Sequence, residues 1–172
     1  MSCDITRGRA KSCKTGIGGV SKLYLFNFLE DSFTVTSGVA TAMNASLTEA
    51  FVYDLTGDGQ VLVEDMVSDR AAGTTTNTQT TTAILQKIDV ATSAEMKLIA
   101  NGYPIAVVLS KDGNYHLVGQ EEGIDFVVNS TTGTTQAEFS GYTLTGTSTE
   151  KELGAILDSS TVTAFLAVVT AN

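Results

Sequence analysis

The chain has 172 residues, of which 42% are hydrophobic and 17% are charged, and its 10 basic and 19 acidic side chains give a net charge of -9. This length predicts one domain. Without a run of 18 apolar residues or an apolar leader, we expect neither a membrane span nor a secretory signal. One His, two Cys and no Trp leave little material for a metal cluster or an imidazole-centred site, so neither an enzyme nor a cofactor is expected.

Charge is distributed unevenly along the chain. Residues 1–22 carry five basic side chains and one acidic side chain, a balance of +4, whereas the other 150 residues carry 5 basic against 18 acidic, a balance of -13. We therefore divide the chain into a basic, Gly-rich N-terminal arm, 1–22, and a single β-rich domain, 23–172. Proteins bind duplex DNA largely through Lys and Arg side chains that neutralise its phosphates. We therefore expect the acidic body to repel DNA. The arm is free to dock on a neighbouring copy or on its own body, unless it is a loosely ordered terminus.

The first half of the body contains short β-prone runs. They predict strands over 20–29, 33–36, 50–55, 60–67 and 80–90. The turn sequence 56–59 contains two glycines and predicts a hairpin that joins the third of these strands to the fourth. The polar stretch 68–79 has almost no apolar side chains and is interpreted as a long exposed loop. Loops of about 12 residues are uncommon in compact domains, so this one is a candidate contact element.

The second half contains one helix and more strands. Thr92 to Glu95 fits a capping box, and Gly102 with Pro104 ends the helix. Lys111-Asp112-Gly113 between apolar runs predicts a hairpin of 105–110 with 114–119. Further strands are expected over 124–129, 139–146 and 161–170, with a loop at 130–135 and a helical turn or irregular crossing at 153–157. The pattern favours an all-β antiparallel sandwich or barrel with one short mid-chain α-helix.

Residue patterns typical of chemical sites are weak. Cys3 and Cys13 are spaced too widely in the sequence for a zinc knuckle, and we interpret them as free thiols. A disulfide between them is the alternative interpretation. His116 lies in a predicted strand without a partner motif. The order of residues 13–19 differs from that of a P-loop. Glu121 and Glu122 are adjacent and would point apart in a strand or turn, so we do not interpret them as a carboxylate pair.

Segments 1–9, 13–20 and 23–28, with 111–119 and 139–145 downstream, resemble a family of small virion structural proteins of tailed phages, notably phages of Bacteroidetes hosts. The resemblance covers nearly the whole chain through short, glycine-punctuated patterns. His116 departs from it, since an aromatic or aliphatic residue is usual there. The order of elements is similar to the phage tail-tube fold, whose subunits assemble into stacked hexameric rings.

The resemblance implies a phage tail tube protein that self-assembles into a DNA-conducting tube within the virion, after assembly in the host cytoplasm. Its partners would be further copies, other virion structural proteins and DNA in transit, with no membrane. A capsid or head auxiliary (decoration) protein is the alternative, and a host-surface binding module is an alternative of another class. The candidate inter-subunit contacts are Arg7, Arg9, Lys11, Glu64, Asp65, Met66, Asp69, Arg70, Thr74, Thr75 and Thr76.

Overall fold

The computed structural model describes residue 5 and residues 7–170. Among these residues the chain forms twelve strands and two helices, and the strands lie in two sheets. The predicted β-rich class is confirmed. No helix of the described part is long and apolar enough to cross a membrane.

The large sheet has eight strands and is mostly antiparallel, with short parallel pairings at β11–β3 and β12–β4. Its strands, in spatial order, are β12 (Val169–Thr170), β4 (Ala50–Asp54), β1 (Val20–Phe26), β7 (Ile105–Ser110), β8 (Tyr115–Val118), β11 (Ile156–Leu157), β3 (Val39–Met43) and β2 (Phe33–Thr36). β1 begins at Val20, so the last three residues assigned to the arm belong to the body.

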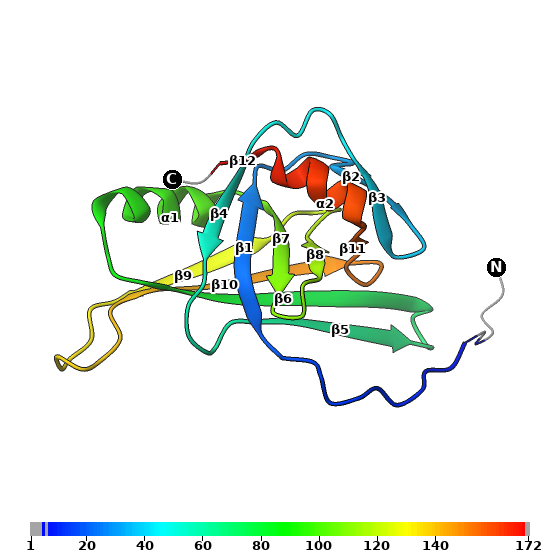
Figure 1. Ribbon diagram of the computed structural model, residues 1–172, viewed down its shortest axis with the longest axis horizontal. Helices are drawn as coiled ribbons and strands as arrows, with labels where there is room; N and C mark the ends of the chain where they lie inside the picture. The colour runs from blue at the N-terminus through cyan, green and yellow to red at the C-terminus, as the bar shows by residue number, and fades with distance from the viewer. Residues whose placement is uncertain (1–4, 6, 171–172) are drawn as a thin grey trace.

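The small sheet has four strands and is antiparallel throughout. Its spatial order is β5 (Val61–Asp69), β6 (Thr74–Gln86), β10 (Gly141–Glu150) and β9 (Asp125–Thr131). Figure 1 shows these strands lying crosswise beneath the strands of the large sheet. Two sheets that pack face to face in this way bury one face of each.

Two apolar cores hold the layers together because both faces of β1 are covered. Leu23 and Leu25 face the small sheet and pack with residues such as Leu144, while α1 (Val90–Asn101) closes this core with Met96 and Ile99. The alternate residues face α2 (Ser159–Leu166), where the fully buried Phe165 meets Tyr24 edge to face with ring centroids 5.5 Å apart. Figure 1 shows α2 above the large sheet, on the side opposite the small sheet.

The start of α1 differs from the predicted capping box. The helix begins at Val90, and its N-cap is Asp89, whose Oδ1 accepts a hydrogen bond of 2.8 Å from the Thr92 amide. The predicted capping box assigned the Thr92 amide to the Glu95 carboxylate, whereas the Asp89 carboxylate, three residues before Thr92, accepts its hydrogen bond.

The C-terminal prediction was wrong for 161–170, which forms α2 and β12 rather than one strand. Asp158 caps α2 by accepting a 2.7 Å hydrogen bond from the Thr161 amide, and helical spacing buries Thr161 together with Phe165. The crossing at 153–157 contains the two-residue strand β11, and the strand β3 was not predicted. The turn 56–59 joins β4 to β5 in different sheets, so it closes no hairpin.

The predicted loop 68–79 was also wrong, because it belongs to a long hairpin. β5 continues to Asp69 and β6 starts at Thr74, which leaves only residues 70–73 as the turn. Asp69 Oδ1 accepts a 2.7 Å hydrogen bond from the Ala71 amide, and Gly73 adopts a φ of 66°. Threonine is β-branched and favours strands, so a polar run rich in threonine extends the sheet rather than leaving it.

Candidate assembly surfaces

The outward face of the small sheet consists largely of threonine. Along β6 and β10, the side chains that point inward are buried, and those that alternate with them point outward to solvent. We call the outward set the threonine face; it comprises Thr76, Thr78, Thr80 and Thr82 of β6 and Thr143, Thr145, Thr147 and Thr149 of β10.

The strand register arranges these hydroxyls in rows. Thr82 lies opposite Thr145, and the next two pairs down the ladder are Thr80 with Thr147 and Thr78 with Thr149. The flanking strands extend the first row with Val61 on β5 and Val127 on β9. The face therefore presents hydroxyl and methyl groups at the centre of the sheet.

The small sheet as a whole carries acidic charge without compensation. Its four strands contain no Lys, Arg or His. Their charged side chains are all carboxylates, namely Glu64, Asp65, Asp69, Asp125 and Glu150. A polyanion that approaches these four strands meets hydroxyls and like charge. The basic residues next to them in the chain lie just beyond strand ends, namely Arg70, Lys87 and Lys151.

Both edges of the small sheet are open. β5 and β9 each pair on one side only among the described residues, with β6 and with β10 respectively. β5 is nine residues long and ends its hydrophobic alternation with Val67, which is 62% exposed. A long, apolar edge strand of this kind offers unpaired amide and carbonyl groups to another chain.

The predicted contact residues of the hairpin gather at its closed end, with one exception. The exposed ones are Asp65, Met66, Asp69, Arg70, Thr74, Thr75 and Thr76. Met66 is 49% exposed, and Figure 1 places the closed end of the hairpin at the right of the molecule. These side chains are therefore accessible to solvent.

Glu64 is the exception, because its side chain points into the protein. Its Oε1 accepts hydrogen bonds from Gln79 Nε2 at 3.1 Å and from the Gly154 amide at 2.9 Å. Gln79 is 2% exposed, and its Oε1 accepts the Gly119 amide at 3.0 Å. This buried network ties β5 and β6 to the loops beyond β8 and β10, so the role of Glu64 within the subunit is structural.

The arm is extended and exposed. Arg7, Arg9 and Lys11 are all exposed, and no hydrogen bond or ion pair joins residues 7–14 to the described part of the body. The arm first contacts the body where the Ile17 amide donates to Asp112 Oδ1 at 2.8 Å. The structure therefore does not bring the predicted arm residues to those of the hairpin.

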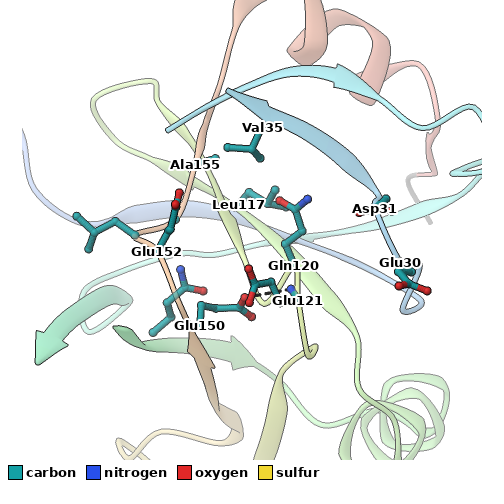
Figure 2. A pocket seen from close by; sticks show the side chains of 12 residues that line it. Glu30, Asp31, Val35, Leu117, Gln120, Glu121, Glu150, Glu152 and Ala155 are labelled. Carbon is teal, nitrogen blue, oxygen red and sulfur yellow. Dashed lines mark hydrogen bonds between the residues drawn. The ribbon is translucent and has the colours of Figure 1, made fainter. Parts of the chain in front are cut away.

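A cavity of about 300 Å³ lies where the end of β10 meets β2 and the loop after β8. Every charged side chain that lines it is a carboxylate: Glu30, Asp31, Glu121, Glu150 and Glu152. Figure 2 shows Glu121 and Glu150 together on one wall, with Glu30 and Asp31 beyond Gln120. We call this the acidic cavity.

Glu150 is the most enclosed of these carboxylates, with 7% of its surface exposed. Its Oε1 accepts a 2.8 Å hydrogen bond from Ser148 Oγ, and its Oε2 accepts the Glu121 amide at 3.0 Å. Burial raises the pKa of Glu150, and these two hydrogen bonds offset part of that effect. Within the part of the chain that the structure describes, this carboxylate has hydrogen-bond donors but no cation beside it.

The two cysteines and the one histidine are the residues that the sequence offers for a metal or imidazole-centred site. No group of three or more His, Cys, Asp or Glu in the described residues has the geometry to hold a metal ion. Cys13 is an exposed free thiol, and Cys3 lies outside the described residues. His116 is half-buried in β8, and burial lowers its pKa.

Comparison of the chain with protein-family models, with curated proteins and with solved structures finds no match. The surfaces that sequence reasoning missed are the threonine face and the acidic cavity. A period-2 pattern in 74–82 and 143–149 signals the threonine face, since threonine occupies every second position in both runs. No sequence signal marks the acidic cavity, whose walls come from distant segments.

Proposed function

We propose that this protein is a structural subunit that self-assembles into closed, stacked rings and forms a DNA-conducting tube, as in the tail tube of a phage virion. The observation that carries the proposal is the small sheet, which combines two open edges with an uncovered face that lacks cations. The resemblance to tail-tube-like virion proteins points to the same function.

The strand directions of the small sheet suit ring closure. The antiparallel order β5-β6-β10-β9 makes the two edge strands run in opposite directions. When copies are related by rotation, β9 of one copy meets β5 of the next as an antiparallel pair. Each copy would then add four strands to one continuous barrel, and closure would remove both open edges of the small sheet.

The threonine face suits the wall of a channel for DNA. In such a ring the large sheet and α2 form the outer layers, and the threonine face lines the lumen. DNA adheres to proteins chiefly through Lys and Arg on its phosphates. A lining of hydroxyls with only carboxylates as charged groups lets the duplex slide without being held.

Lysines at the edge of the small sheet test this function. Val61 on β5 and Val127 on β9 would lie near the seam between copies, so the double variant Val61→Lys/Val127→Lys places positive charges where edges must meet. We expect rings and tubes of the wild type in electron micrographs and in light scattering, and their loss in this variant.

The matched control is Thr145→Lys, which adds a lysine to the same row at the centre of the sheet. It is expected to assemble, because the seam is unchanged. A wild type that stays monomeric at high concentration would contradict the proposal, as would a double variant that assembles normally.

A further inference from the structure

The acidic cavity is a second surface that the proposed edge pairing leaves unused. It is a hollow of about 300 Å³ rather than a flat acidic patch, and its apolar floor includes Leu117 and Ala155. Glu150 is more than nine-tenths buried in its wall and has no cationic partner. The ion pair found among the described residues, Lys22 with Asp54 at 2.8 Å, does not involve the cavity.

A buried carboxylate without a cation is costly, because removal from water disfavours its charged form. An arginine that enters such a pocket gains charge-assisted hydrogen bonds, and its planar guanidinium matches a carboxylate in a two-point contact. The cavity therefore has the chemistry of a receptor for a cationic side chain.

The chain itself supplies a cationic segment of complementary charge. The exposed arm carries Arg7, Arg9, Lys11 and Lys14, and residues 7–14 make no hydrogen bond or ion pair with the described part of the body. The nine residues from Arg7 to Thr15 span about 30 Å when extended, which is enough to reach an adjacent subunit. Ile17 anchors the base of the arm to Asp112 in the β7–β8 turn.

We propose that the arm of one copy docks on the next copy by placing Arg7 or Arg9 in the acidic cavity, against Glu150 and the exposed carboxylates at its rim. This inference rests on the proposed self-assembly and names the surface that the arm recognises. The occupant is a second copy because the arm is extended away from its own body (Figure 1).

Isotope-mixed cross-linking tests the contact on the full-length protein. Equal amounts of ¹⁴N- and ¹⁵N-labelled protein are mixed under assembly conditions and treated with a carbodiimide, which joins lysine amines to carboxylates with loss of water. We expect mixed-mass peptides that link Lys11 or Lys14 to Glu121 or Glu152, and their loss in Glu121→Gln/Glu152→Gln. Links of a single isotope only, or links to acids elsewhere such as Asp58, would overturn the inference.

Charge reversal supplies a second readout. The variant Arg7→Glu/Arg9→Glu should raise the protein concentration needed for half-assembly by on the order of tenfold at low salt, and less at high salt where charges are screened. Adding Glu121→Lys/Glu152→Lys should restore assembly, whereas the control pair Glu49→Lys/Asp58→Lys, outside the cavity, should not. Equal rescue by both pairs would overturn the inference.

The two proposals fail separately. Rings that form in micrographs without mixed-mass links at the cavity overturn the arm contact and leave the proposed function standing. The absence of rings from wild-type protein overturns the proposed function itself.

Discussion

Gln79 and Gly119 lie forty residues apart in the chain, and a buried hydrogen bond of 3.0 Å joins the Gly119 amide to Gln79 Oε1. Gln79 belongs to β6 of the small sheet, whereas Gly119 follows β8 of the large sheet. The same glutamine holds Glu64 through its Nε2. One side chain thus bridges the two layers and fixes the hairpin that carries the proposed contact residues.

Gln79→Met should lower the free energy of unfolding by about 1–3 kcal/mol, because it leaves the buried Gly119 amide and the Glu64 carboxylate without this partner. Chemical denaturation measures the change. The control Thr80→Val alters the next residue, which points outward, and should change stability by less than about 0.5 kcal/mol. Equal stabilities of the two variants would show that the network contributes nothing.

Glu150→Gln should make the isolated subunit more stable than the wild type at pH 7. Because the folded pKa of Glu150 is raised, its contribution to stability is largest below its ordinary value of 4.5 and is lost as pH rises through the raised value. Glutamine keeps the shape, donates to Ser148 Oγ and accepts the Glu121 amide, without a charge.

The measurement is the difference in unfolding free energy between the two proteins from pH 4 to pH 8. The advantage of Glu150→Gln should grow as pH rises across this window. An advantage that is constant with pH would show that the ionisation of Glu150 is not its cause.

Asp89→Ala should lower the melting temperature, because the Thr92 amide at the start of α1 loses its acceptor. Asp89→Asn retains a capping oxygen and should lose much less. Hydrogen bonds from Thr92 lower the pKa of Asp89, so its contribution is present above the ordinary value of 3.8 and is lost as pH falls through the lowered value. Identical melting temperatures of the alanine variant and the wild type at pH 7 would contradict this role.

Thr80→Lys/Thr147→Lys should make assembled protein retain duplex DNA, with retention that weakens steeply as salt rises. The two residues lie opposite each other at the centre of the threonine face. The control is Ala164→Lys, which adds a lysine at an exposed position of α2. DNA held inside the tube is protected from nuclease, and the control should not increase the amount of protected DNA. Equal protection of DNA by both variants would place the threonine face outside the lumen.

Much of the β-rich class followed from the sequence, because local signals coincide with burial there. The runs that form β1, β2, β4 and β7 contain apolar residues between turn signals, and the Asp-Gly turn before β8 adopts the expected conformation, with a φ of 88° at Gly113. These elements needed no knowledge of distant contacts.

The errors arise where tertiary contacts decide the structure. Residues 74–79 contain no apolar side chain, yet Asn77 and Gln79 are buried. Distant loops supply hydrogen bonds to both, since Asn77 Nδ2 donates to the Glu152 carbonyl and Gln79 Oε1 accepts the Gly119 amide. Residues 159–166 are β-prone, but the Asp158 cap and the fit of Phe165 against β1 favour a helix. The acidic cavity joins segments that are far apart in the chain, so only the fold reveals it.

Hydrogen exchange on β5 and β9 tests most directly whether copies join through the edges of the small sheet. In dilute subunits, the amides of β5 and β9 that point to the open edge of the sheet should exchange quickly. The amides of β6 and β10 should exchange slowly, because both of these strands are paired on both sides. In concentrated, assembled protein the amides of β5 and β9 should become as protected as those of β6 and β10. Edge amides that stay equally fast in both states, while assemblies are present, would contradict the account.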